Sequence, residues 1–475
     1  MTEGMRISPA EVKFSSMSLV DEGRVFRWNG RLFRAIRAEH AKAVQRLFSS
    51  GLIDALVKEG VFVHSRITDY QIDGFELVVE HQIVEVVSYP REWSFSMLKE
   101  AALLILRVNE IASGFGYQTT DCQAYNILFV GETPLYIDLG SFIPFQQKEV
   151  SILALDEFLR TYYYPIKIWS SVGVAWGLRA VQRPGLLLDT EDYLRCRWPI
   201  FRWPIADPIG KIVSKVYKIC SMTDEVFSDM KRRHPAWKGV LAERCRSLKG
   251  SLASIEGLRT SIQNVNRRAK KTPWSDYHCS FTEQNGGIRL SPRFQYIADL
   301  LMSLGVSSIL EIAGNQGVLS RAVKRMKPSL VVTCTDADES ALDKGFCASK
   351  GEGLGINWAV LNPLFTELAT VEDSPSARFQ ADAVVVLALT HHVVLSNGFR
   401  LEWVLGQLSQ FCRNYILIEF MPLGLSTGPN SLPTPAWYTR EWFQKEFEAR
   451  FHLISWTQLE ENRMLFVGTK KDSLN

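Results

Sequence analysis

The sequence has 475 residues, more than the roughly 100 to 200 of one ordinary domain, so we expect two large domains and a connector. Hydrophobic residues make up 46% and charged residues 22%, which excludes a disordered chain and a fibrous repeat. The 54 Lys and Arg nearly balance the 51 Asp and Glu, and a net charge of +3 argues against nucleic-acid binding by bulk electrostatics. Small molecules or proteins are the expected partners.

The cysteines and the apolar runs bear on the compartment and on metal binding. The 8 cysteines are scattered, with no C-x-x-C pair, so we expect a reduced, cytoplasmic protein and assign no metal and no disulfide. The N-terminus lacks the apolar core of a signal peptide. Since no apolar run approaches the ~20 residues that cross a bilayer, we expect no membrane insertion.

The first part of the chain predicts a small sheet followed by helices. Asn29-Gly30 separates two strand-like runs and favours a tight hairpin. Helical spacing over residues 39–56 is interrupted by Gly51, and a strand-like run follows at 75–87. Apolar residues at helical spacing predict a long buried helix that ends at Gly114.

Later segments alternate between strands and helices. Residues 125–130 and 134–139 read as strands around a turn at 131–132, and residues 151–250 as mostly helical. The polar, basic pattern over 252–272 favours a solvated connector helix over a binding patch. From residue 309 to the end, seven strand-like runs alternate with helical stretches, which indicates an open α/β sheet.

The segment ILEIAGNQG, residues 309–317, is an apolar strand that ends in a turn of small residues before a helix. In a doubly wound sheet such a turn borders the ligand crevice, where small residues let the backbone approach a cofactor. The spacing differs from the dinucleotide G-x-G-x-x-G pattern and from a phosphate-binding loop, so NAD or ATP is a weak expectation here.

Two polar residues follow the next two strands. Asp336 ends the run VVTCTD, where a carboxylate can accept the two ribose hydroxyls of an adenosine ligand. Helix capping is the alternative role for Asp336 and for nearby Asp338. The side-chain amide of Asn362, after the third strand, could bond an adenine ring, although Asn-Pro also favours an ordinary turn.

The fourth strand runs into His391 and His392, the best catalytic candidates. Histidine titrates near neutrality and can remove a proton from an attacking hydroxyl or amine, while a structural role is the alternative, favoured for at least one of them. If the reaction at this crevice is methyl transfer, an in-line displacement, it needs alignment and no covalent enzyme nucleophile. Cys334 and Cys347 are therefore not required as nucleophiles.

The segments EIAGNQGVLS, ALTHHVVLSN, ILIEFMPLG and YTREWFQKEFEARF resemble a family of bacterial class I S-adenosylmethionine-dependent methyltransferases that includes nodulation-protein-like members. Upstream, GRLFRAI, SSGLIDALV, SYPREWSFSMLKEAALLILRV, DCQAYNILF and YIDLGSF look like the N-terminal half of the same family, so the resemblance covers nearly the whole chain.

The resemblance implies S-adenosylmethionine as the cofactor. It implies that Asp336 binds the ribose, that His391 and His392 face the methyl group, and that the methionine end is lined by Glu311, Ala313, Gly314, Asn315 and Gly317. Two residues depart from the family pattern: Ala313 replaces the usual first glycine, and Asn362 stands where an aspartate is common.

The N-terminal half also has a kinase-like pattern. Asp121 and Asn126 have the D-x-x-x-x-N spacing of a catalytic loop, and Asp138-Leu-Gly follows like a magnesium-binding D-F-G. A glycine-rich phosphate loop and the V-A-I-K lysine are missing, with only Arg34 and Arg37 as substitutes. We expect a degenerate kinase-like domain, with an active kinase or chance turn chemistry as alternatives.

The expected fold class is therefore α/β, with a C-terminal Rossmann-like class I methyltransferase sheet and an N-terminal α+β kinase-like domain. We predict a kinase-like domain over 1–250, a helical connector over 251–275 and a methyltransferase domain over 276–475. The expected reaction is methylation, by preference on oxygen, of a small-molecule or carbohydrate acceptor, whose pocket we place in loops 284–296 and 422–440. A non-catalytic cofactor-binding scaffold and a bifunctional kinase-methyltransferase are the alternatives.

Overall fold

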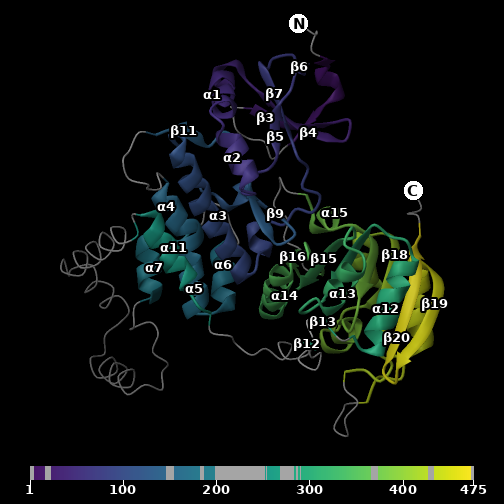
Figure 1. Cartoon of the computed structure of the whole chain (residues 1–475). Coiled ribbons are helices and arrows are strands. Elements are labelled where there is room, and N and C mark those ends of the chain that lie inside the picture. Colours follow the sequence, from purple (N-terminus) through teal and green to yellow (C-terminus); the bar gives the residue numbers. More distant parts are fainter. Residues whose placement is uncertain are drawn as a thin grey trace, which may run out of the picture. The chain divides into compact units, whose positions relative to one another are not determined.

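The computed structural model describes residues 5–15, 23–145, 154–181, 187–197, 252, 254–267, 283–284, 287–288, 290–364, 373–425 and 433–471 (Figure 1). The chain divides into two compact units. Unit 1 comprises Met1–Leu98, Ile127–Ile137 and Ala269–Asn475, and unit 2 comprises Lys99–Asn126 and Asp138–Arg268. In the described ranges no helix is long and apolar enough to cross a membrane, and no three His, Cys, Asp or Glu residues cluster as metal ligands.

Unit 1 contains a seven-stranded sheet in the order β16-β15-β14-β17-β18-β20-β19. The first five strands in this order are parallel to one another, and β20 runs antiparallel to both β18 and β19. Each strand-like run predicted from residue 309 onward forms a strand, so the α/β expectation is confirmed. The strands are β14 Ser308–Ile312, β15 Val331–Asp336, β16 Asn357–Val360, β17 Ala381–Val386, β18 Cys412–Phe420, β19 Phe451–Glu460 and β20 Arg463–Lys470.

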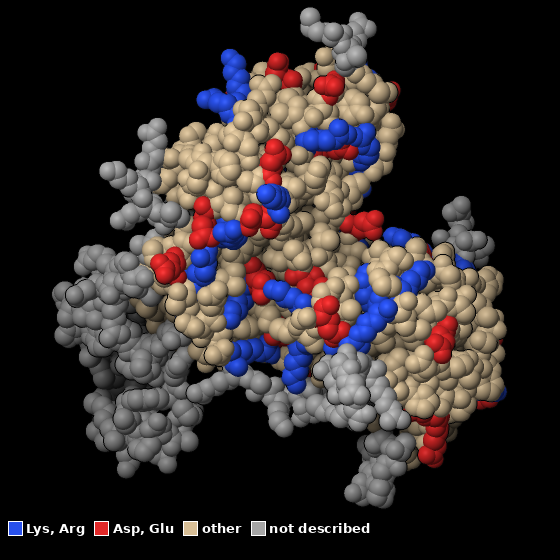
Figure 2. All heavy atoms as spheres, in the orientation of Figure 1, with Lys and Arg blue, Asp and Glu red and all other residues tan. Residues whose placement is uncertain are grey.

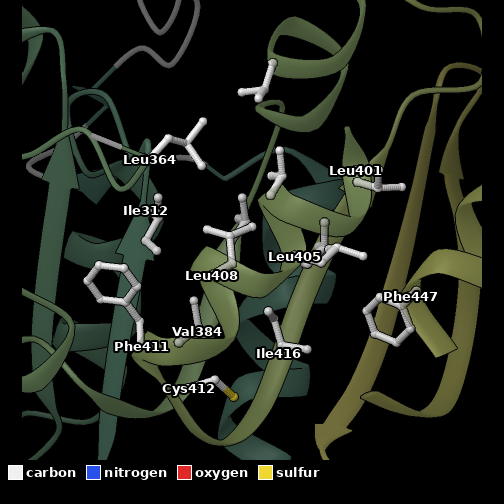
Figure 3. Packing of buried hydrophobic residues seen from close by; sticks show 14 of the residues in the cluster. Ile312, Leu364, Val384, Leu401, Leu405, Leu408, Phe411, Cys412, Ile416 and Phe447 are labelled. Carbon is white, nitrogen blue, oxygen red and sulfur yellow. The ribbon is translucent and has the colours of Figure 1, made fainter. Parts of the chain in front are cut away.

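Helices cover both faces of this sheet because its central strands are apolar on both sides. Ile312 and its neighbours on one face pack against α16 Leu401–Phe411 and α17 Arg440–Arg450 (Figure 3). Glu311 points to the other face, where Ser320 of α13 Val318–Met326 contacts it. α12 Pro292–Ser303 and α14 Glu339–Glu352 lie on that second face, and α15 is the short helix Pro375–Arg378.

A second sheet in unit 1 is antiparallel, in the order β2-β3-β4-β7-β5. Asn29 (φ 47°) and Gly30 (φ 72°) form the predicted tight turn, and Gly51 (φ 80°) separates two helices as expected. The predicted strand at 75–87 is shorter than expected. The elements are β1 Arg6–Ile7, η1 Pro9–Glu11, β2 Lys13–Phe14, β3 Gly23–Trp28, β4 Arg31–Ile36, α1 Ala38–Ser49, α2 Leu52–Lys58, β5 Ser65–Ile67, β6 Gln71–Ile72, β7 Leu77–His81 and η2 Pro90–Glu92.

The hairpin of β9 Ile127–Val130 and β10 Thr133–Tyr136 packs against the seven-stranded sheet region. Glu132, in its turn, is 5% exposed. Its carboxylate accepts the backbone N–H groups of Gly355 and Ile356, both at 2.9 Å, and the hydroxyl of Ser349. The aromatic ring of Phe129 lies 6.3 Å from that of Phe346 in α14. This hairpin is therefore fastened to α14 and to the start of β16.

Residues 87–96 are fastened to the same region by charged groups. Glu92 and Arg378 form a buried ion pair whose side chains are each 4% exposed. Glu339 of α14 accepts the backbone N–H of Phe95 at 2.9 Å, and Asp343 accepts that of Ser96 at 2.8 Å. We call the contacts of residues 87–96 and of the β9–β10 hairpin with residues 339–378 the seam. Unit 1 thus draws on residues from both sides of the predicted domain boundaries.

Unit 2 is mostly helical where it is described. The predicted long helix is α3 Phe95–Gly114, which begins in unit 1 and continues in unit 2. β8 and β11 form a short antiparallel ladder. The other elements are β8 Tyr117–Thr119, η3 Ala124–Asn126, β11 Phe142–Pro144, α4 Leu155–Phe158, η4 Leu159–Tyr163, α5 Tyr164–Ser171, α6 Val174–Val181, α7 Thr190–Arg197 and α11 Ile255–Gln263; residues 198–251 lie outside the described part.

The expectation of a solvated connector helix is wrong for α11. Ile255, Leu258 and Ile262 are at most 3% exposed, because their spacing places them on one helix face. Arg259 pairs with Glu110 of α3 at 2.9 Å. The polar residues between these apolar positions made the sequence of a packed helix look solvated.

On the face shown in Figure 2, basic and acidic side chains are interspersed.

Candidate functional site

A cavity of about 540 Å³ lies at the carboxyl ends of the central parallel strands. This volume falls in the usual range for small-molecule and cofactor sites, and the location is the one that open α/β sheets use for ligands. The lining residues are Arg293, Phe294, Glu311, Ala313, Gly314, Asn315, Asp336, Ala337, Asp338, Leu361, Asn362, Pro363, Leu364, Leu387, Ala388, Leu389, His392, Val393, Ser396, Asn397 and Phe399.

Most of the residues singled out from the sequence meet at this cavity. Of the nine residues predicted for the methyltransferase site, two do not line it, namely Gly317 and His391. Those that do are Glu311, Ala313, Gly314, Asn315, Asp336, Asn362 and His392.

The loop after β14 has an unusual backbone. Ala313 (φ 58°) and Asn315 (φ 53°) both adopt the left-handed region, which is unfavourable for residues with a Cβ. A Cβ on Gly314 would lie 2.6 Å from Sγ of Cys334, so glycine is required there. The loop is therefore tightly wound and brings its backbone to the cavity, although only one of these three positions is glycine.

Gly317 acts in packing. It precedes α13 with φ 63°, and a Cβ would lie 2.5 Å from the ring of Trp358 in β16. A side chain would push α13 away from the sheet. The small-residue pattern of the sequence thus combines a cavity loop with a helix-packing position.

Glu311 is buried at the base of the loop, 4% exposed. Its Oε2 accepts the backbone N–H of Ser320 at 3.0 Å and the Ser320 hydroxyl at 2.5 Å. Burial raises the pKa of Glu311 to about 7, while the bonds from Ser320 oppose that shift. The carboxyl group joins the cavity loop to the first turn of α13.

Asp336 ends β15 and holds the same loop from the other side. Its Oδ2 accepts the backbone N–H of Asn315 and its Oδ1 that of Asp338, both at 2.7 Å. Burial raises the pKa of Asp336 to about 6. Asp338 caps α14 by accepting the N–H groups of Ser340 and Ala341, so the capping alternative holds for Asp338.

Asn362 lies beside apolar walls formed by Leu361, Pro363 and Leu364. Its Oδ1 accepts the backbone N–H of Leu364 at 3.1 Å, which is the turn chemistry expected of Asn-Pro. Asn362 therefore both shapes the turn and lines the cavity.

His391 and His392 have different surroundings. Their ring centroids are 4.0 Å apart. His391 is 3% exposed, and burial, with His392 and Arg463 adding to it, lowers its pKa to about 3. His392 is half-buried, lines the cavity and also has its pKa lowered by burial. Both imidazoles are neutral at pH 7, and His392 is the one that borders the cavity.

The lining of the cavity agrees only in part with the sequence expectation. Arg293 and Phe294 come from the first turn of α12 and lie within the predicted acceptor loop 284–296, whereas no described residue of 422–440 lines the cavity. Leu387 to Leu389 also contribute, and so do Val393 and Ser396 of the π-helix η6, His392–Ser396, with Asn397 and Phe399 after it. These residues reach the cavity through backbone geometry that no local motif encodes.

The kinase-like residues lie in unit 2 and are not among the residues that line this cavity. The β8–β11 ladder joins their loops: the N–H of Asp121 bonds the Ser141 hydroxyl at 3.2 Å. Oδ1 of Asp121 accepts the N–H of Gln123 at 2.7 Å, and Oδ1 of Asp138 accepts that of Gly140 at 3.1 Å. Asn126 ends the short helix η3.

No family model matches the chain. The chain is 24% identical over 424 residues to "Nodulation protein NoeA" of Rhizobium meliloti (strain 1021), covering 84% of this chain and 83% of that protein.

Solved structures with detectable likeness include a SAM dependent methyltransferase from Aquifex aeolicus (11% identity, 38% of this chain, 100% of that chain, TM-score 0.29). An O-methyltransferase family protein from Burkholderia thailandensis has 17% identity over 38% of this chain and 56% of that chain, with a TM-score of 0.26. The N-terminal domain of EvdMO1, solved in the presence of SAH and D-fucose, has 14% identity over 42% of this chain and 91% of that chain, with a TM-score of 0.30.

Proposed function

We propose that this chain is an S-adenosylmethionine-dependent methyltransferase that methylates a hydroxyl group of a small-molecule or saccharide acceptor. One observation carries the proposal. The loop 313–315, in which Ala313 and Asn315 are left-handed, and the carboxylate of Asp336 are brought together at the ends of β14 and β15 by the bond from the Asn315 N–H to Asp336. A strand-end carboxylate beside a close-approaching backbone suits an adenosine ligand with an amino-acid tail.

The polar and apolar groups that line the cavity fit this cofactor. The carboxylate of Asp336 accepts backbone N–H groups on both oxygens, and because a carboxylate offers about four lone-pair sites it keeps capacity for a ribose hydroxyl. Leu361, Pro363 and Leu364 supply apolar surface for the adenine ring. The cavity volume of about 540 Å³ suits a ligand of this size.

The cofactor supplies a methyl group on a sulfonium, which is transferred by in-line displacement. The chain's main task is to align the acceptor and to exclude water. The neutral imidazole of His392, at the cavity wall, can accept the proton that an acceptor hydroxyl loses. His391, behind it, is too buried and too weakly basic for that task.

Charge favours an uncharged acceptor group. The charged side chains of the described lining are Arg293, Glu311, Asp336 and Asp338, and all four already bond other parts of the chain. Residues 387–399 contribute only uncharged lining when His392 is neutral. Because desolvating a charge without a partner is costly, a hydroxyl fits better than a carboxylate, phosphate or ammonium. The saccharide class rests on the resemblance to a methyltransferase family that includes nodulation-protein-like members.

Calorimetric titration with S-adenosylmethionine tests the cofactor site. Asp336→Asn should abolish saturable binding. Asp382→Asn is the matched control, because Asp382 also accepts two backbone N–H groups, those of Ser307 and Ser308, but does not line the cavity. Absence of binding to the wild type, or binding that Asp336→Asn leaves intact, would refute the proposal.

Turnover measurements test whether His392 acts as the general base. Release of S-adenosylhomocysteine is measured with a panel of hydroxylated saccharides and phenols. His392→Gln should lower turnover about 100-fold or more, within the usual range for a general base, without abolishing cofactor binding. Cofactor binding by the wild type without turnover on any acceptor of the panel would favour the non-catalytic scaffold instead.

A nucleotide site in unit 2 is a second candidate, and the β8–β11 ladder that joins the Asp121 and Asp138 loops favours it. Asn126 and Asp138 would bind Mg²⁺-ATP in a kinase-like site. Titration with ATP in the presence of Mg²⁺, on the wild type and on Asp138→Asn, decides between this candidate and a degenerate domain. Absence of a heat of ATP binding, or a heat of binding that Asp138→Asn leaves unchanged, would exclude the nucleotide site.

A further inference from the structure

One buried carboxylate joins three elements around the cavity. Glu419, in β18, is 0% exposed. Its Oε1 accepts Nη1 of Arg293 from α12 at 2.6 Å, and its Oε2 accepts Nη1 of Arg463 from β20 at 3.0 Å. Oε2 also accepts the backbone N–H of Ala388, in the turn after β17, at 3.0 Å. A carboxylate without solvent contact is retained only where such donors surround it.

The turn that Glu419 holds is conformationally unfavourable. Ala388 has φ 50°, a region that alanine seldom adopts. Among the described residues, four non-glycine residues have positive φ, and three of them, Ala313, Asn315 and Ala388, line the cavity. Asp336 restrains Asn315 through its backbone N–H, and Glu419 restrains Ala388 in the same way.

A second bond from Glu419 restrains the same turn. The hydroxyl of Thr390 donates to the backbone carbonyl of Glu419 at 2.8 Å, and Thr390 is 1% exposed. The two bonds lie on either side of Leu389, which lines the cavity, and His392 lies two residues after Thr390. The wall of the cavity that carries His392 is therefore anchored to one residue of β18.

Glu419 itself does not line the cavity, whereas Arg293 and Ala388 do. We propose that Glu419 is a positioning residue, which fixes the α12 wall and the 387–389 wall of the cofactor cavity relative to each other. This inference rests on the proposed methyltransferase function for its consequence, because misplacement of a wall by a fraction of an ångström weakens cofactor alignment. The restraint of the turn can be tested without any ligand.

Hydrogen exchange of residues 386–396, followed by mass spectrometry, is the first test. Glu419→Gln should accelerate exchange in this segment about tenfold, since one oxygen acceptor is replaced by a donor. Glu460→Gln is the matched control: Glu460 contacts Arg463 at 3.2 Å and Arg293 at 3.6 Å, but is 48% exposed. Equal exchange in wild type and folded Glu419→Gln would overturn the proposal.

A milder variant covers the outcome in which Glu419→Gln does not fold. Thr390→Val keeps the side-chain shape and removes only the second bond, and it should accelerate exchange of the same segment several-fold. Unchanged exchange in this variant, when Glu419→Gln does not fold, overturns the proposal equally.

Rescue by Ala388→Gly separates positioning from general stability. Glycine adopts φ 50° without cost, so the turn needs less restraint. Glu419→Gln should weaken S-adenosylmethionine binding about tenfold, and adding Ala388→Gly should recover about threefold or more of it. A loss that Ala388→Gly does not relieve overturns the positioning role. If the wild type binds no S-adenosylmethionine, the proposed function fails, and exchange alone decides whether Glu419 holds the turn.

Discussion

The core of the seven-stranded sheet and the seam are both buried, but different forces stabilise them. Leu405, Leu408 and Ile416 in the core contribute apolar area, which is non-directional and tolerates small displacements (Figure 3). In the seam, Glu92 and Glu132 rely on ion pairs and hydrogen bonds that require defined geometry. Loss of one partner in the seam is therefore expected to cost more than loss of a comparable surface contact.

The largest expected effect concerns the seam. Arg378→Met leaves the Glu92 carboxylate buried without its partner and should lower the free energy of unfolding by about 3–5 kcal/mol. The double variant Glu92→Leu with Arg378→Met should recover most of that loss, because no charge stays buried. Arg400→Met is the control, since the Arg400–Glu402 pair is 85% and 51% exposed and is expected to contribute at most about 1 kcal/mol. Denaturant unfolding measures all three; equal losses at 378 and 400 would contradict the comparison.

The next effect concerns packing in the core. Gly317→Ala introduces a Cβ 2.5 Å from Trp358 at φ 63° and should cost about 2–4 kcal/mol, from overpacking and left-handed backbone together. Gly353→Ala is the control, because Gly353 has nearly the same φ of 66° and nothing within 4 Å. It should cost only the backbone share, roughly 1 kcal/mol. Thermal unfolding that shows equal losses would mean that Trp358 yields to the new side chain.

Two buried titratable groups of the sheet region make opposite contributions to pH dependence. The folded-state pKa of His391 is about 3, below its usual 6.5, so the unfolded chain binds more protons and stability falls as pH drops below 6.5. The pKa of Glu311 is raised from 4.5 to about 7, so stability falls as pH rises from 4.5 to 7. Each contributes at most about 1.4 kcal/mol per pH unit, and the two oppose each other between pH 4.5 and 6.5.

Single variants should separate these slopes. In His391→Gln, stability should increase as pH falls from 7 to 4.5. Glu311→Gln should show the opposite slope below pH 6.5. Denaturant unfolding across pH measures both, and parallel pH profiles in the two variants would contradict the assignment.

The smallest expected effect concerns cofactor binding. Asp336 must be ionised to accept a ribose hydroxyl, and its pKa is about 6. Affinity for S-adenosylmethionine should therefore be constant above pH 7 and fall by up to about tenfold per unit below pH 6. Calorimetry from pH 5 to 8 measures the dependence, and an affinity that rises on acidification would exclude this role.

The sheet was predictable because its information is local. Apolar runs and turn residues such as Asn29-Gly30 identify strands and hairpins, and Asp336 could be placed at a strand end. The seam could not be predicted, because Glu132 and Ser349 are 217 positions apart and neither carries a motif. Glu419 was missed for the same reason: its partner Arg293 is 126 positions away. α11 was misread because sequence polarity concealed its buried face.

The sequence separation within the seam has a consequence during synthesis. Ser349 follows Glu132 by 217 positions, so at about 5–20 residues per second the hairpin waits roughly 10–40 s for its partner. An apolar docking face would remain exposed throughout that interval as a target for misassembly. Glu92 and Glu132 stay hydrated until α14 and Arg378 emerge from the ribosome. The polar groups of the seam can thus remain hydrated while they wait for their partners, and in the finished protein they require strict geometry.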